Sequence, residues 1–138
     1  MPLRPVTPDF AVAPQIAVDE IPAIAAAGYK TVIVNRPDGE DPGQPTMDEM
    51  RAAAEAAGMT FVEIPVVSGR FTPDAVDATR SAIETAGGPV FAYCRSGTRS
   101  VTLWALAEAS TRGADAVIAA AADAGYDLSP LRPHLQGG

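Results

Sequence analysis

The segment most informative about the fold reads Pro89-Val-Phe-Ala-Tyr-Cys-Arg-Ser-Gly-Thr-Arg-Ser100. It begins with a short apolar run, Val90 to Tyr93, that is typical of a buried strand, and an apolar stretch with the pattern of a helix follows Ser100. A loop between a strand and a helix N-terminus turns backbone N–H groups and the positive end of the helix dipole toward one point. The segment therefore predicts an anion-binding loop around Cys94, the only cysteine of the chain.

The residues around this cysteine favour a reactive thiol. A cysteine reacts as its thiolate, and helix N-termini and neighbouring cations lower cysteine pKa values from about 8.5 to roughly 3.5–7.5. Here Arg95 and Arg99 supply cations, and Ser100 supplies a hydroxyl donor. We expect Cys94 and Arg99 to be catalytic, and we expect the substrate anion to be bound by Arg95, Ser96, Gly97, Thr98 and Ser100. The alternative is an inert buried thiol, which would not require two arginines, a serine and a glycine beside it.

Length and composition indicate one small domain. The chain has 138 residues, 47% of them hydrophobic, and we expect a single domain over 1–138 with its core at about 6–126 and a tail at 127–138. No apolar run approaches the roughly 20 residues of a membrane span, and Met1-Pro-Leu-Arg-Pro5 lacks the apolar core of a signal peptide. A single cysteine suits a reducing compartment. These features predict a soluble, cytoplasmic protein with no membrane partner.

The charge pattern narrows the range of ligands. The net charge is −7 and the basic residues are scattered, which argues against a nucleic-acid partner and favours a small anionic substrate in a locally positive pocket. The only histidine, His134, lies in the proline-rich tail, and no cluster of His, Cys and carboxylates has metal-ligand spacing. We therefore expect neither a metal nor another cofactor.

Helix and strand signals alternate along the chain. Gly28, Gly58 and Gly88 recur every thirty residues, and each ends a helix-compatible stretch and precedes a run with strand composition, at 31–34, 60–64 and 90–93. Helices are expected from Asp19 to Ala27, from the capping box of Thr46 and Glu49 to Gly58, from Thr72-Pro73 to about Ala86, from Thr98 or Arg99 to Gly113, and from Asp115 to Ala124, with a short turn at Ser129-Pro130. This alternation predicts an α/β fold with a mainly parallel central sheet flanked by helices.

Two more loops are expected to lie beside the cysteine. Ligands of parallel sheets bind outside the carboxyl ends of the strands, and the segments Asn35–Pro45 and Val66–Phe71 each leave such an end. Their polar residues are possible neighbours of the sulfur, namely Asn35, Arg36, Ser68 and Arg70. For each of them an ordinary turn or solvated side chain is the alternative.

Four segments carry a family resemblance: Asn35-Arg-Pro-Asp-Gly-Glu40, Pro42-Gly-Gln-Pro45, Ile64-Pro-Val-Val-Ser-Gly69 and Tyr93-Cys-Arg-Ser-Gly-Thr-Arg-Ser100. The order of strand, cysteine loop, Arg-Ser and helix is similar to cysteine-dependent phosphatases of the dual-specificity type. More closely, the segments resemble the small bacterial family called beta-lactamase hydrolase-like. The resemblance covers roughly residues 6–112 and implies a single-domain cysteine-phosphatase-like fold. It also implies an enzyme, since this family is often assigned as a sulfur transferase and in some members is fused to a persulfide dioxygenase.

Two departures from the phosphatase pattern favour sulfur transfer. Only four residues separate Cys94 from Arg99, one fewer than in phosphatases, and the loop resembles that of single-domain rhodaneses. The stretch Val67-Ser68-Gly69 also lacks the aspartate that protonates the leaving oxygen in phosphatases, and Asp74 and Asp77 fall in the next helix. General acids contribute about 10²–10⁴-fold, whereas sulfite leaving thiosulfate needs no proton.

The main hypothesis is therefore a rhodanese-like sulfurtransferase. Cys94 would take sulfane sulfur from thiosulfate or a persulfide and pass it to a thiol or cyanide, with a persulfide dioxygenase as a possible partner. The first alternative is a cysteine-dependent phosphatase that forms a phosphocysteine on Cys94. The second is a non-catalytic module that binds an anion or regulates a partner.

Overall fold

The computed structural model describes residues 3–67 and 70–136. Its strands form one mixed sheet in the order β1-β2-β5-β3-β4. They are β1 (Arg4–Thr7), β2 (Phe10–Ala13), β3 (Thr31–Val34), β4 (Thr60–Glu63) and β5 (Val90–Tyr93). β1 runs antiparallel to β2, and all other neighbours are parallel, so the carboxyl ends of β2, β3, β4 and β5 meet at one edge of the sheet.

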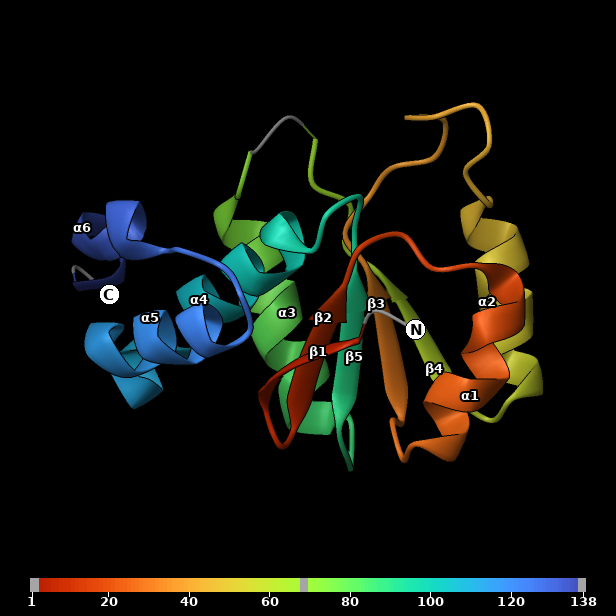
Figure 1. Cartoon of the computed structure of the whole chain (residues 1–138), viewed down its shortest axis with the longest axis horizontal. Coiled ribbons are helices and arrows are strands. Elements are labelled where there is room, and N and C mark those ends of the chain that lie inside the picture. The colour runs from red at the N-terminus through yellow and green to blue at the C-terminus, as the bar shows by residue number, and fades with distance from the viewer. Residues whose placement is uncertain (1–2, 68–69, 137–138) are drawn as a thin grey trace.

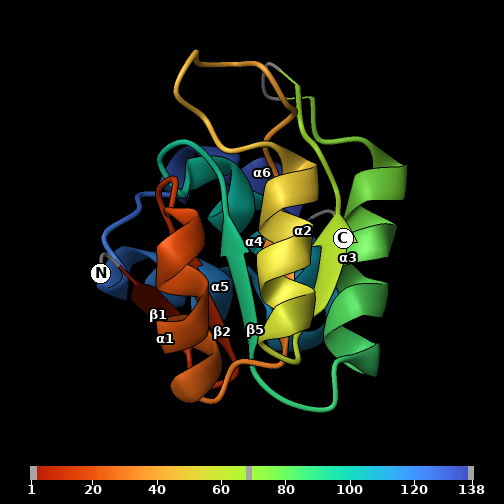
Figure 2. The same ribbon diagram turned by 90° about the vertical axis from the view of Figure 1, so that its right-hand side faces the viewer.

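Helices cover both faces of the sheet (Figure 1). The 3-10 turn η1 (Val18–Glu20), α1 (Ile21–Ala26) and α2 (Met47–Ala56) lie on one face, in front of the strands in Figure 2. The other face carries α3 (Pro73–Thr85), α4 (Thr98–Arg112), α5 (Ala114–Asp123), the 3-10 turn η2 (Ser129–Leu131) and α6 (Arg132–Gln136). This is the α/β architecture that the sequence predicts.

The central strand β5 is buried on both sides. Val90 and Ala92 belong to the apolar cluster that includes Trp104 of α4, while Phe91 and Tyr93 belong to the cluster that includes Met50 of α2. Alternate residues of a strand point to opposite faces, so one strand contributes to both clusters. The strand that ends just before Cys94 is therefore held between two packed layers, which gives the cysteine loop a rigid base.

The local helix signals of the sequence are confirmed at two sites. The Thr46 hydroxyl accepts from the Glu49 N–H (3.1 Å), and the Glu49 carboxylate accepts from the Thr46 N–H (3.0 Å), which completes the capping box that starts α2. Thr72 caps α3 by accepting from the Ala75 N–H (3.1 Å), and Pro73 occupies the first helical position.

The first part of the chain differs from the prediction. β1 and β2 were not expected, because each has only four residues and neither stands out as an alternating pattern between the prolines at 5, 8 and 14. Asp19 does not cap a helix: it lies within η1, and α1 begins two residues later at Ile21. Among the described residues, no helix is both long enough and apolar enough to cross a membrane.

Candidate active site

Cys94 lies at the carboxyl end of β5, directly before the turn into α4. The residue is fully buried, and its backbone N–H donates to the carbonyl of Ala13 at the end of β2 (3.4 Å). The sheet therefore fixes the Cα position of the cysteine. The loop of residues 94–97 then bends so that α4 starts at Thr98.

Gly97 makes this bend possible and donates to the sulfur. It is the N-cap of α4 with a φ of 92°, in the left-handed region that favours glycine, and its N–H donates to Cys94 Sγ (3.1 Å). A Cβ at this position would lie 2.0 Å from the hydroxyl oxygen of Tyr126. Both the backbone conformation and the neighbouring tyrosine therefore require glycine here.

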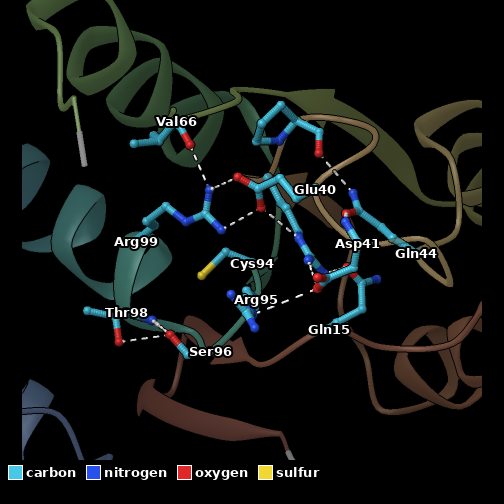
Figure 3. A network of polar contacts seen from close by, with 12 residues as sticks. Gln15, Glu40, Asp41, Gln44, Val66, Cys94, Arg95, Ser96, Thr98 and Arg99 are labelled. Atoms are coloured by element: carbon cyan, nitrogen blue, oxygen red, sulfur yellow. Dashed lines mark hydrogen bonds and ion pairs between the residues drawn. The ribbon is translucent and has the colours of Figure 1, made fainter. Parts of the chain in front are cut away.

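Arg99, in the first turn of α4, is anchored by two groups from other loops (Figure 3). Its Nη1 donates to the carbonyl of Val66 (2.7 Å) and to Glu40 Oε2 (2.9 Å), and its Nη2 donates to Glu40 Oε1 (2.8 Å). The hydrogen bond with Glu40 raises the pKa of Arg99, and charge and hydrogen-bond interactions with Cys94 add to that rise. The guanidinium thus stays charged beside the sulfur.

Glu40 also binds a second, buried arginine. Arg36 is 2% exposed, and its Nε donates to Glu40 Oε1 (2.8 Å). Its Nη1 donates to Gln15 Oε1 (3.0 Å), and its Nη2 pairs with Asp41. Hydrogen bonds from Arg99 and Arg36 lower the pKa of Glu40, with the larger effect from Arg99, although burial opposes them. Glu40 is therefore an ionised bridge between the cysteine loop and the β3–α2 connection.

The other loop residues have different surroundings. The side chain of Arg95 is 71% exposed, and its Nε lies 3.7 Å from Asp41 Oδ2, so the arginine lies at the border of the network. The hydroxyl of Ser96 donates to that of Thr98 (3.1 Å) at the exposed side of the loop. The buried hydroxyl of Ser100 has no hydrogen-bond partner among the described residues.

The four expected neighbours from the other two loops differ in where the structure places them. Arg36 belongs to the network described above. Asn35 instead joins strand ends, because its side-chain amide donates to the carbonyl of Ile64 (2.9 Å) and its backbone N–H donates to that of Tyr93 (2.9 Å). Arg70 is exposed and its backbone N–H donates to the Val67 carbonyl (3.0 Å), while Ser68 lies outside the described residues.

The two carboxylates of the site, Glu40 and Asp41, both form ion pairs with arginines. Glu40 accepts from Arg99 and Arg36, and Asp41 pairs with Arg36 and Arg95. The segment 64–73 contains no Asp or Glu. Among the described residues, the site therefore places arginines and backbone donors around the sulfur, and its two carboxylates are ion-paired with arginines rather than free to protonate a leaving group. Among the described residues, no group of three or more His, Cys, Asp or Glu side chains could hold a metal ion.

Sequence reasoning missed the four residues that support the loop from elsewhere in the chain: Gln15, Glu40, Asp41 and Tyr126. Glu40 and Asp41 lie in the long polar segment that follows β3 at the carboxyl edge of the sheet, where ligands of parallel sheets bind. This position is a signal that could have identified them as site residues. Tyr126 carries no local signal, because it meets the loop only through the packing of the α5–η2 connection.

The chain matches known proteins in sequence. A family model described as beta-lactamase hydrolase-like protein, phosphatase-like domain, matches residues 2–111. A beta-lactamase hydrolase-like protein of Agrobacterium fabrum is 43% identical over 98 residues, which make up 71% of this chain and 23% of that protein. The chain thus spans less than a quarter of the length of the curated relatives that it matches.

It also matches solved structures. A candidate phosphatase of Neisseria meningitidis is 34% identical and superposes with a TM-score of 0.86, covering 99% of this chain and 98% of that one. A candidate phosphatase of Shewanella putrefaciens, 19% identical, superposes with a TM-score of 0.73 over 98% of this chain and 84% of that one, and shows the fold alone.

These comparisons correct the sulfurtransferase hypothesis, which is wrong. The matching family model describes a phosphatase-like domain, and the Neisseria protein is named as a candidate phosphatase. The physical reason is that the shorter loop does not by itself decide the chemistry: Glu40 and the Val66 carbonyl still hold Arg99 beside the sulfur. Thiosulfate and persulfides as substrates, and a persulfide dioxygenase as partner, lose their basis with that hypothesis.

Proposed function

The chain belongs to the beta-lactamase hydrolase-like family, whose matching domain is phosphatase-like, and from this premise we propose that it is a cysteine-dependent phosphatase for small phosphomonoesters. Two features of the site together carry the proposal. The Gly97 N–H donates to the Cys94 sulfur, and Arg99 is anchored beside that sulfur by Glu40 and the Val66 carbonyl. A thiolate stabilised in this way is a nucleophile, and the guanidinium is the anion-binding group it needs.

Arg99 keeps the donors that a phosphate requires. A guanidinium has five N–H groups, and the contacts with Glu40 and Val66 use both N–H groups of Nη1 and one of Nη2. The Nε–H and the second Nη2–H are not used by Glu40 or Val66, and they form a parallel pair on the guanidinium of Arg99, which also interacts with the Cys94 sulfur. Such a fork fits two oxygens of one phosphoryl group.

The proposed reaction has two displacement steps. The Cys94 thiolate attacks phosphorus, an S–P bond forms, the P–O bond to the leaving group breaks, and the leaving oxygen takes a proton from water. Water then attacks the phosphocysteine, the S–P bond breaks, and inorganic phosphate leaves as the thiolate is restored. The loop N–H groups and Arg99 stabilise the charge on the phosphoryl oxygens in both steps.

The test is hydrolysis of p-nitrophenyl phosphate by the purified chain and matched variants. We expect Cys94→Ser to reduce p-nitrophenol release to background. Arg99→Lys keeps the charge but loses the fork, so we expect kcat/KM to fall about 10²-fold. Arg112→Lys, at the far end of α4, is the control and should retain wild-type rates. Turnover that persists in Cys94→Ser would overturn the proposal.

A further inference from the structure

The peptide group between Ser96 and Gly97 makes hydrogen bonds at both of its ends. Its carbonyl oxygen, on Ser96, accepts from the hydroxyl of Tyr126 (2.9 Å). Its N–H, on Gly97, donates to Cys94 Sγ (3.1 Å). In a trans peptide these two groups lie in one plane and point in opposite directions. The contact with Tyr126 on one side therefore orients the donor to the sulfur on the other.

Tyr126 is itself held in place. It is 8% exposed, its backbone N–H donates to the carbonyl of Ala121 at the end of α5 (2.8 Å), and the Arg4 guanidinium lies 5.3 Å from the centre of its ring. Burial raises the pKa of Tyr126, so the phenol remains a protonated donor at neutral pH. A fixed, protonated phenol beside a carbonyl is a specific hydrogen-bond donor to it.

The loop backbone alone does not select this orientation. Glycine adopts positive and negative φ about equally well, so Gly97 permits the peptide to turn over. In the turned-over form the carbonyl oxygen of Ser96 would face the sulfur, and its partial negative charge would oppose a thiolate. The turned-over form would also give up the hydrogen bond from Tyr126.

We propose that Tyr126 is a positioning residue that holds the Ser96–Gly97 peptide with its N–H toward Cys94 and so favours the thiolate. The inference concerns the state of the sulfur, and it rests on the proposed phosphatase function only for its kinetic consequence.

The variant Tyr126→Phe removes one oxygen atom and leaves the ring. The main readout is the pH profile of alkylation by iodoacetamide, which reports on Cys94 alone because the chain has no other cysteine. The groups that interact electrostatically with Cys94 include Arg99 of α4, with Glu40 beside it, and Tyr126 itself. Only Tyr126 changes in this variant. Tyr29→Phe is the control, because Tyr29 lies between α1 and β3, at the opposite edge of the sheet.

We expect the alkylation midpoint of Tyr126→Phe to rise by about half to one pH unit, the shift that loss of one ordinary hydrogen bond would produce. On p-nitrophenyl phosphate we expect kcat to fall about 3- to 10-fold with KM nearly unchanged. Tyr29→Phe should change neither quantity. Thermal unfolding of both variants identifies any general loss of structure.

The outcomes separate this inference from the proposed function. A shifted alkylation profile without phosphatase activity in the wild type would support the positioning role and refute the phosphatase. An unshifted profile in a folded Tyr126→Phe protein would overturn the positioning role, whatever the activity.

Discussion

At the scale of single residues, Glu40 connects the proposed catalytic loop to the rest of the site. It accepts hydrogen bonds from Arg99 on α4 and from the buried Arg36 after β3. Removing its charge would leave two partly or fully buried cations without their shared anion, which is costly even when the pair itself adds little stability. Glu40 is therefore expected to matter for both activity and stability.

We predict that Glu40→Gln lowers kcat/KM on p-nitrophenyl phosphate about 10- to 100-fold, because Arg99 loses the bidentate contact that fixes the orientation of its guanidinium. The matched control is Glu84→Gln, an exposed glutamate on α3, which should behave as the wild type. Equal activity of the two variants would show that Arg99 does not depend on Glu40.

The same glutamate predicts a pH dependence of stability. The pKa of Glu40 is lowered in the folded state, chiefly by the hydrogen bond from Arg99. Its stabilising contribution is therefore present above the unfolded-state pKa of about 4.3 and is lost as the pH falls through the lower folded value. Urea unfolding at pH values between about 6 and 3 should show a steeper loss of unfolding free energy in the wild type than in Glu40→Gln. Parallel curves for the two proteins would contradict this assignment.

A third prediction at this scale concerns the leaving group. The segment 64–73 has no carboxylate, and both Glu40 and Asp41 are engaged by arginines. Without a proton donor the rate should depend on the acidity of the departing alcohol. We expect aryl phosphates to exceed alkyl phosphates in kcat/KM, which reports the step that expels the leaving group, by about 10²–10⁴-fold, the usual contribution of a general acid. Similar kcat/KM values for p-nitrophenyl phosphate and phosphoserine would contradict the absence of a proton donor.

At the scale of elements, the junction of β5 and α4 depends on the backbone of Gly97. We predict that Gly97→Ala reduces kcat at least about 10²-fold, since the new methyl group would strike the Tyr126 hydroxyl and move the loop. Gly113→Ala is a close control, because Gly113 has a similar φ of 90° with no atom within 4 Å of the added Cβ. The control should lose some stability, measured by thermal unfolding, and keep its activity. Comparable activity losses in both variants would rule out the Tyr126 contact as the cause.

The elements also show what could be predicted from the sequence. The strand at 90–93 and the helix starts at Thr46 and Thr72 have local causes, namely strand composition and capping side chains, and all three agree with the structure. β1 and β2 lack such causes, because their pairing with each other and with β5 is what makes them strands.

The residues of the site also divide into those with a local sequence signal and those placed by long-range packing. The positions of Cys94 and Gly97 depend on the turn between β5 and α4, which is visible in the sequence. The partners that orient the loop lie far away in the chain: Glu40 meets Arg99 from 59 residues upstream, and Tyr126 meets Ser96 from 30 residues downstream. No local pattern encodes such contacts, since they exist only once the layers have packed.

At the scale of the whole molecule, one sheet supports two apolar clusters on its opposite faces. Because β5 contributes to both, we predict that the chain unfolds in a single cooperative transition, as expected of one domain. The fluorescence of Trp104, which belongs to one cluster, should follow the same urea curve as far-UV circular dichroism, which reports on all helices. Two separate midpoints would contradict the single-domain prediction.

The central claim, that Cys94 carries the phosphoryl group during turnover, is tested most directly by trapping the intermediate. The protein is mixed with p-nitrophenyl phosphate, quenched within milliseconds in denaturant, digested and analysed by mass spectrometry. We predict one added phosphoryl group on the peptide that contains Cys94, and none on that peptide in Cys94→Ser. Rapid release of p-nitrophenol with Cys94 unmodified, or with the phosphoryl group on another residue, would contradict the account.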